Sequence, residues 1–454
     1  MLKKAKDFVM ALLGTGQEGQ LARGSALLLV AKVFGALSGY IMAFLLTKRG
    51  GAEAVGIYEL SFTCIMLLSV VSRFGLDGAI VRYIGVFGAR DQEGAVKWLY
   101  RKSMFFALIF AAVLGLGVYA LAPTLSSVFG DAPGDTSLIT PFRWATLAMV
   151  FFTLLNMNGE TLRGYKKMLA YSLFQQGSVI FVAVVLLWFV IHGEAVGLSG
   201  VQAFLAASVL LFVISQFIVL QKFRSVKPME TPAESFSAVQ KVAWPIFLSS
   251  SIFMVMSWTD TLMIGYFLNK ADVGVYRIAF KISTVITFTQ FAVNGIAAPM
   301  IAEHYHNNDM QGLRGLIHKI GVLNFLLSVP IFLIILFAPS TLLGLFGEEY
   351  LGGEMILLTL AFGQVVFALS GPVMYILTMT KHEKTALYIM YITAGINLIG
   401  NLVLIPVFGL QGAAMATAFT TFLWNILAVI AVFRFLGIVS VPFIHRFIEK
   451  PLKK

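Results

Sequence analysis

Twelve apolar runs of about 20 residues follow one another along this chain, and they limit its fold more than any other feature. A helix of about 20 apolar residues is long enough to cross the hydrocarbon core of a bilayer. Charged residues make up 12% of the chain, against roughly 25% in soluble domains. The runs are 25–46, 57–77, 102–122, 141–162, 169–191, 200–220, 242–267, 275–299, 317–338, 354–378, 385–406 and 411–434. The sequence therefore predicts an all-α polytopic membrane protein.

Basic residues are distributed unequally between the two sets of connecting segments. Cytoplasmic loops are enriched in Lys and Arg, and one alternating set holds about 25 of them, whereas the other holds about three. The basic set is 1–24, 82–102, 163–168, 221–241, 300–319, 379–384 and 434–454. We therefore expect a cytoplasmic-membrane protein with both termini inside. The net charge of +11 is then mainly a topology signal, not a nucleic-acid-binding surface.

The chain also contains an internal duplication. Gly56-Ile57-Tyr58 recurs as Gly274-Val275-Tyr276, 218 positions later, and further fragments match in the same order. Each copy holds six runs, so both copies have the same orientation and their pseudo-two-fold axis is expected along the membrane normal. The predicted organisation is 1–24 cytoplasmic or interfacial segment, 25–220 N-lobe, 221–241 cytoplasmic linker, 242–434 C-lobe and 435–454 basic tail.

Four of the basic residues inside predicted spans are candidates for binding, since an ionisable side chain there costs at least about 2.5–3.5 kcal/mol. Lys32 is in the first run and Arg73 in the second. Arg277 and Lys281 share one face of the eighth run because they are four residues apart. Asp77 follows Arg73 at the same spacing, so an internal ion pair is the alternative for that arginine. The other three have no acidic residue at helical spacing in their own runs, and we expect them to bind an anionic ligand.

Oxygen-bearing side chains occupy similar depths in three other runs. Asp260 lies in the seventh run, Asn397 and Asn401 lie one turn apart in the eleventh, and Thr417 lies in the twelfth. Hard cations take carboxylate, amide and hydroxyl oxygens as ligands. Hydrogen bonding between helices is the alternative for the same residue types, and depth alone leaves both open.

These motifs resemble a known superfamily of transporters. The Gly-x-Tyr fragments of both halves, and the segment 409–417 that opens the last run, are similar to the multidrug/oligosaccharidyl-lipid/polysaccharide exporter superfamily. Within it the chain resembles the polysaccharide and O-antigen flippases, over residues 20–435. The resemblance implies a flippase, not an enzyme, that moves a polyprenyl-diphosphate-linked oligosaccharide across the membrane by alternating access, for surface polysaccharide biosynthesis. Glycosyltransferases and a glycan polymerase are the implied protein partners.

The resemblance also assigns roles to residues. In that branch a cationic cavity between two six-helix lobes takes the substrate, so Lys32, Arg73, Arg277 and Lys281 would face the diphosphate. The related lipid II flippases carry a sodium site of Asp, Asn, Asp, Thr and one backbone carbonyl. The matching residues here are Asp260, Asn397, Asn401, Thr417 and Ala413. Asn401 departs from the pattern because it replaces a carboxylate, so the implied coupling ion is Na⁺ or H⁺.

Three other classes of membrane protein require residues that differ from those of a flippase. A cation-coupled drug or metabolite antiporter of the same superfamily needs an acidic cavity, for which Asp77, Glu160 and Asp260 are the available residues. A major-facilitator carrier needs a Gly-Arg-basic run after the second span, which the loop 88–94 lacks. A polymerase or glycosyltransferase needs a large outer loop with catalytic acids, and the predicted outer loops are short.

Overall fold

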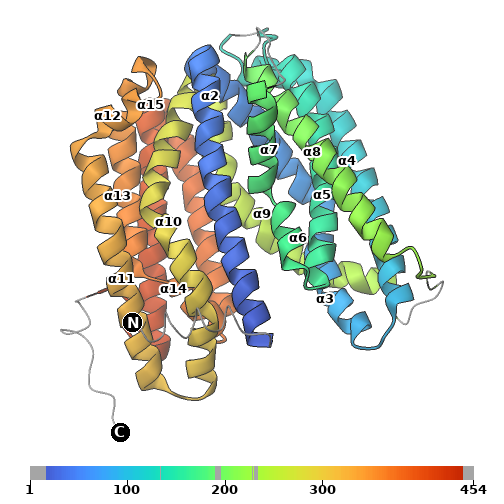
Figure 1. Cartoon of the computed structure of the whole chain (residues 1–454). Helices are drawn as coiled ribbons and strands as arrows, with labels where there is room; N and C mark the ends of the chain where they lie inside the picture. Colours follow the sequence, from blue (N-terminus) through green and yellow to red (C-terminus); the bar gives the residue numbers. More distant parts are fainter. Residues whose placement is uncertain (1–16, 133, 190–195, 228, 230–233, 443–454) are drawn as a thin grey trace. The chain divides into compact units, whose positions relative to one another are not determined.

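The computed structural model describes residues 17–132, 134–189, 196–227, 229 and 234–442, and they fold into helices joined by short connections (Figure 1). The helices are α2 (Gln17–Arg73), α3 (Leu76–Gly88), α4 (Glu93–Phe129), α5 (Ile139–Gly164), α6 (Met168–Leu173), α7 (Gln176–Phe189), α8 (Val196–Lys222), α9 (Phe236–Phe267), α10 (Lys270–His306), α11 (Met310–Phe337), α12 (Pro339–Gly344), the 3₁₀ helix η1 (Glu348–Gly353), α13 (Glu354–Ser370), α14 (Val373–Met379) and α15 (Glu383–Leu436). The all-α prediction is confirmed.

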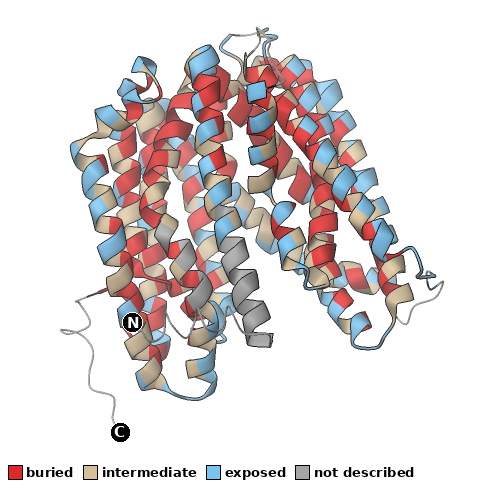
Figure 2. Ribbon diagram, in the orientation of Figure 1, coloured by how far each residue is buried: buried red, intermediate tan, exposed pale blue. Residues whose placement is uncertain are grey.

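Seven helices in the described part of the chain are long and apolar enough to cross a membrane. α15 contains two predicted runs, and α2 contains the first run and most of the second; in each helix a glycine with a positive φ joins the two. These joints are Gly51 in α2, at φ 66°, and Gly409 in α15, at φ 57°. Glycine occupies this region without the steric cost that a Cβ imposes. Buried and exposed residues alternate along the helices, as expected when one face packs and the other faces lipid (Figure 2).

The chain divides into two compact units. The first comprises residues 1–50 and 57–254, and the second comprises 51–56 and 255–454. The division therefore lies within α9, whereas the sequence predicts a linker at 221–241. The first part of α9 packs in the first unit because Gly75 has no side chain to separate α3 from the backbone of Ala243. The rings of Phe74 and Phe247 stack there, with centroids 4.9 Å apart.

In the first unit, α5 packs against α4 and α8. Small residues recur every four positions on the buried face of α4, at Ser103, Ala107, Ala111 and Gly115. This spacing places them in one row along the helix. Small residues let membrane helices approach closely, so the row forms the seam between α4 and α5.

In the second unit, the two halves of α15 fold back on each other at Gly409. Gly412 lies against the backbone of Leu404, and Gly400 faces Ala416. The residue number rises from 412 to 416 in one half while it falls from 404 to 400 in the other, so the two halves are antiparallel. This hairpin carries the eleventh and twelfth predicted runs side by side.

Candidate functional site

Asp260 is the centre of a buried polar cluster in the second unit. Its side chain is 6% exposed and lies on α9. Oδ2 accepts hydrogen bonds from the Tyr276 hydroxyl at 2.7 Å and from the Thr417 hydroxyl at 2.5 Å. Oδ1 accepts a hydrogen bond from Nδ2 of Asn401 at 2.6 Å. A buried carboxylate requires hydrogen-bonding partners, and these three come from α10 and from both halves of α15.

The two asparagines on α15 extend this cluster. Nδ2 of Asn401 also lies 3.2 Å from Oδ1 of Asn397, whose own amide donates to the Thr420 hydroxyl at 3.3 Å. The α15 hairpin makes this last bond possible because its antiparallel halves place Asn397 opposite Thr420. Asn401 is fully buried, and its Oδ1 has no hydrogen-bond partner within the described chain. An orphaned buried amide oxygen is unusual and calls for an explanation.

The structure thus joins most of the oxygen-bearing residues that the sequence singled out. Asp260, Asn401 and Thr417 are in direct contact, and Asn397 is joined through Asn401. Ala413 is fully buried one turn before Thr417 on α15. Its backbone role stays a prediction.

Tyr276 is the member of the cluster that sequence reasoning did not assign to it. The side chain is 1% exposed, and its hydroxyl also lies 3.2 Å from the Thr417 hydroxyl. The available signal was the repeated Gly-x-Tyr fragment, which marks Tyr276 as the second copy of Tyr58. That repeat indicated duplication, but it did not show which side chain faces Asp260.

The donor set of this cluster suits a hard monovalent cation. It offers one carboxylate together with hydroxyl and amide oxygens, which are the ligand types that hard cations take. A single carboxylate balances one positive charge, so the occupied cluster would be neutral. The orphaned Oδ1 of Asn401 is a further acceptor at the same place. Across the described residues there is no cluster of three His, Cys, Asp or Glu side chains that could hold a metal ion.

Arg277 and Lys281 lie on α10 directly beside this cluster in sequence. The Arg277 guanidinium lies over the Trp258 ring at 4.6 Å and over the Phe280 ring at 5.5 Å. The Arg277 side chain is 7% exposed. Guanidinium groups stack on aromatic faces while their N–H groups lie in the guanidinium plane, suited to bidentate recognition of phosphate. Lys281 follows one turn later and is half-buried.

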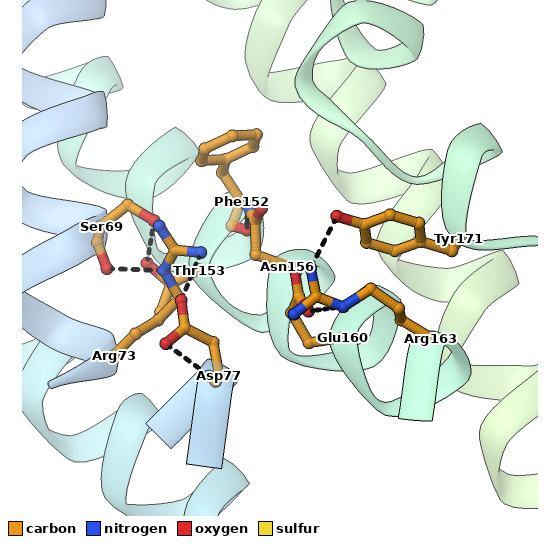
Figure 3. A network of polar contacts seen from close by, with 10 residues as sticks. Ser69, Arg73, Asp77, Phe152, Thr153, Asn156, Glu160, Arg163 and Tyr171 are labelled. Atoms are coloured by element: carbon orange, nitrogen blue, oxygen red, sulfur yellow. Dashed lines mark hydrogen bonds and ion pairs between the residues drawn. The ribbon is translucent and has the colours of Figure 1, made fainter. Parts of the chain in front are cut away.

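In the first unit, Arg73 is part of a charge-balanced network (Figure 3). Its Nη1 lies 3.0 Å from Oδ2 of Asp77, and its Nε donates to the Ser69 carbonyl at 3.2 Å. The ion pair that the i, i+4 spacing offered is therefore present. Lys32 lies on α2, but its side chain is outside the described residues. Contact of Arg73 or Lys32 with a substrate stays a prediction.

A second ion pair lies in the same network (Figure 3). Nε of Arg163 is 2.9 Å from Oε2 of Glu160, and Nη1 of Arg163 is 3.4 Å from the Tyr171 hydroxyl. Asp77 and Glu160, two of the acids that an antiporter of cationic compounds would need, are thus each paired with an arginine.

The repeated glycines lie at close backbone contacts within the second unit. A Cβ at Gly56 would meet the carbonyl of Lys270, and a Cβ at Gly274 would meet the carbonyl of Ala52. Nζ of the buried Lys270 lies 3.3 Å from Oε1 of Glu53. The duplicated fragments therefore pack reciprocally, each glycine against the segment before the other.

Two family models and several known proteins are similar to this chain in sequence. The family described as "Polysaccharide biosynthesis protein" matches residues 21–305, and the MatE family matches residues 245–403. Two relatives from Haloferax volcanii have flippase names. The probable low-salt glycan biosynthesis flippase Agl15 is 24% identical over 88% of this chain and 80% of that protein. The probable flippase AglR is 25% identical over 90% of this chain and 83% of that protein.

Solved transporters share the fold. The lipid II flippase MurJ in an inward closed conformation matches with a TM-score of 0.71 and 16% identity, over 90% of this chain and 87% of MurJ. An inward-facing multidrug transporter of the MATE family matches with a TM-score of 0.70 and 14% identity, over 88% of this chain and 94% of that chain. The family and its structural neighbours are transporters, and this chain is a multi-pass membrane protein. The chain belongs to the polysaccharide biosynthesis protein family, in the flippase branch of the multidrug/oligosaccharidyl-lipid/polysaccharide exporter superfamily.

Proposed function

We propose that this protein is a flippase that moves a polyprenyl-diphosphate-linked oligosaccharide across the cytoplasmic membrane by alternating access, for surface polysaccharide biosynthesis. The observation that carries the proposal is Arg277, a buried arginine on α10 whose guanidinium lies over the rings of Trp258 and Phe280. A guanidinium stacked on aromatic faces keeps its N–H groups in one plane, which suits bidentate binding of a phosphate group. The family match and the flippase names of both Haloferax relatives support the same substrate class.

The proposed substrate contacts are cationic. Arg277 and Lys281 bind the diphosphate from α10, and Lys32 and Arg73 contribute from α2. Arg73 would exchange part of its bond to Asp77 for a phosphate oxygen, so Asp77 keeps the guanidinium paired when no phosphate is near. The polyprenyl tail stays in lipid because its transfer into a polar site is unfavourable.

We further propose that the Asp260 cluster holds the coupling cation, Na⁺ or H⁺. Asp260, Asn401, Asn397 and Thr417 would supply side-chain oxygens, and Ala413 a backbone carbonyl. A bound cation supplies one positive charge that offsets the carboxylate of Asp260. The orphaned Oδ1 of Asn401 supports this assignment.

Orientation and partners belong to the same proposal. Both termini are cytoplasmic, since the basic segments of the sequence fall on one side. Glycosyltransferases that build the lipid-linked oligosaccharide act before this protein, and a glycan polymerase acts after it.

Replacing Arg277 and Lys281 together by alanine tests the function. Each charge-assisted hydrogen bond contributes about 1.5–3 kcal/mol, so the loss of two should reduce flipping by about 100-fold or more. The measurement is surface-glycan export in cells that lack other flippases and depend on this gene. The matched control is Arg101→Ala with Lys102→Ala, an exposed Arg and Lys pair on α4. Normal export by the Arg277/Lys281 variant would refute the diphosphate contacts.

A cation-coupled drug or metabolite antiporter is the second candidate. The structural likeness to a MATE transporter and the MatE match over residues 245–403 favour it. The pairing of Asp77 and Glu160 with arginines counts against an acidic cavity for cationic drugs. Resistance of cells to cationic dyes that rises with expression of this chain, without any effect on surface glycan, would select the antiporter.

A further inference from the structure

The tenth predicted run, 354–378, is interrupted inside the second unit. α13 ends at Ser370, and Gly371 and Pro372 separate it from α14, with Gly371 at φ 73°. Proline has no N–H group, so the Ala368 carbonyl, four residues before Pro372, loses its helical hydrogen bond. A break of this kind is tolerated within a membrane where neighbouring groups or ordered water satisfy the freed backbone atoms.

Gln290 on α10 supplies the donor that the proline lacks. Its Nε2 lies 3.1 Å from the carbonyl oxygens of both Phe367 and Ala368, in the last turn of α13. The side chain is 1% exposed, and its Oε1 has no hydrogen-bond partner in the part of the chain that the structure describes. One end of the amide therefore caps α13, while the other end is a buried acceptor without a partner.

Asn324 on α11 lies level with Gln290. α10 and α11 pack on each other and are joined by the short turn 307–309, so they are antiparallel. The Ser328 hydroxyl donates to the Ile286 carbonyl at 2.8 Å, which fixes their register. One turn back on α11 is Asn324, and one turn on along α10 is Gln290. Asn324 is fully buried, and neither its Nδ2 nor its Oδ1 has a partner among the described residues.

α15 contributes two further unpaired groups at the same break. The Trp424 ring lies 5.8 Å from the Phe367 ring, between centroids, and packs on the core that includes Ile320, one turn before Asn324. Nε1 of Trp424 is buried without a partner within the described chain. The same holds for Oδ1 of Asn425, which is fully buried. Such atoms are few in native proteins, and each calls for an explanation.

The unpaired atoms include both donors and acceptors. Nδ2 of Asn324 and Nε1 of Trp424 donate, whereas the carbonyl oxygens of the three side-chain amides accept. A cation would use only the acceptors, and no carboxylate belongs to this set to balance its charge. Water both donates and accepts, and a buried water typically makes about three hydrogen bonds to groups that have no other partner. The chemistry of the set therefore fits water.

We propose that ordered water is bound at the break in the tenth run by the side chains of Gln290, Asn324, Trp424 and Asn425. Gln290 satisfies the carbonyls at the end of α13, and the bound water satisfies the buried polar atoms that remain. This site shares no residue with the Asp260 cluster, and the inference does not depend on what the protein transports.

The test measures magnetisation transfer from water to the Trp424 indole N–H by NMR, on purified full-length protein with ¹⁵N-labelled indole groups. Trp424→Phe identifies the signal among the six tryptophans. Because Nε1 of Trp424 is buried, bulk water does not reach it. A rotating-frame Overhauser cross-peak at the water frequency, whose sign differs from that of chemical exchange, therefore reports a bound water. We expect this cross-peak in the wild type.

Asn324→Leu removes a proposed water ligand, since leucine has the branching of asparagine and no polar side-chain atom. If Asn324 binds water, this change leaves Gln290 and Trp424 with buried atoms that have lost their partner, which costs free energy. The cross-peak should disappear and the melting midpoint should fall. Asn324→Ser keeps a donor and an acceptor and should retain the cross-peak. The matched control is Asn156→Leu, at a half-buried position on α5, which should leave the Trp424 cross-peak unchanged.

A dry site gives the opposite results. Replacing an amide that has no partner at all by leucine removes the cost of burying it, so the melting midpoint of Asn324→Leu would rise. A wild-type Trp424 signal without the water cross-peak overturns the inference, and so does an Asn324→Leu variant that melts at or above the wild-type temperature. If Asn324→Leu does not fold, the cross-peak in the wild type and its persistence in Asn324→Ser decide the outcome.

Discussion

At the scale of single residues, Asp260 shows how much of a buried polar cluster can be predicted from residue type and depth in the span. Carboxylate, amide and hydroxyl groups at similar depth in three runs predicted a common cluster, and Asp260, Asn401 and Thr417 do meet. Tyr276 could not be assigned from the sequence, because a buried tyrosine on an apolar helix looks like any packing residue. Only the approach of α10 to α9 brings its hydroxyl within 2.7 Å of Asp260.

Asn401→Asp is the residue-scale prediction, because it restores a second carboxylate to the Asp260 cluster. Two neighbouring buried carboxylates repel each other, so the variant should melt at a lower temperature than the wild type in choline chloride. In NaCl it should recover, with a half-maximal effect at about tenfold lower Na⁺, equivalent to about 1.4 kcal/mol of tighter binding. The measurement is the melting midpoint of purified protein across a Na⁺ titration.

Asp260→Asn is the matched control for that titration. It removes the one carboxylate of the cluster, so its melting midpoint should not respond to Na⁺ more than to choline. If the melting midpoints of the wild type and of Asn401→Asp both respond to Na⁺ no more than to choline, this cluster does not bind sodium.

At the scale of elements, the predicted runs coincide with helices, but the sequence did not predict every break within those helices. The run 354–378 is divided into α13 and α14 at Gly371 and Pro372, where proline cannot donate the helical hydrogen bond. The run 169–191 is divided into α6 and α7. Apolar composition predicts how long a membrane-spanning segment is. A break in its helix depends on local backbone geometry and on the helices packed against it.

Gly274→Ala is the prediction at this scale. The added Cβ meets the backbone carbonyl of Ala52, which cannot swing aside as a side-chain end could. Overpacking of this kind costs about 1–3 kcal/mol, so the melting midpoint of the purified protein should fall. Gly395→Ala is the matched control, because a helical glycine with nothing within 4 Å of its Cβ position should tolerate alanine. Equal midpoints for both variants would contradict the close contact.

At the scale of the whole molecule, the duplication and the distribution of basic residues predict the membrane topology. Six runs in each copy predict the same orientation for both, and the basic segments predict which ends are cytoplasmic. The family match supports a transporter with this architecture. The two copies have diverged in chemistry, since Asp260 and Arg277 have no equivalents at Met42 and Glu59.

Site-directed labelling tests the topology. Cys64 is the single cysteine, so Cys64→Ser provides a background without thiols. On that background Asp131→Cys, at an exposed position after α4, should react with a membrane-impermeant maleimide in intact cells. Lys166→Cys, exposed between α5 and α6, should react only after permeabilisation. The reverse pattern would place the termini outside.

The sequence by itself determined that this chain is an all-α membrane protein with a duplicated set of spans, because apolar run length and repetition are properties of the chain alone. It also determined which polar residues are too costly to be accidental, such as Asp260 and Arg277. Only the tertiary structure decided which of them meet. Hydrogen bonds and ring contacts act over about 3–6 Å. They therefore depend on how helices that are distant in sequence pack together, and the residue pattern within a single span does not predict this packing.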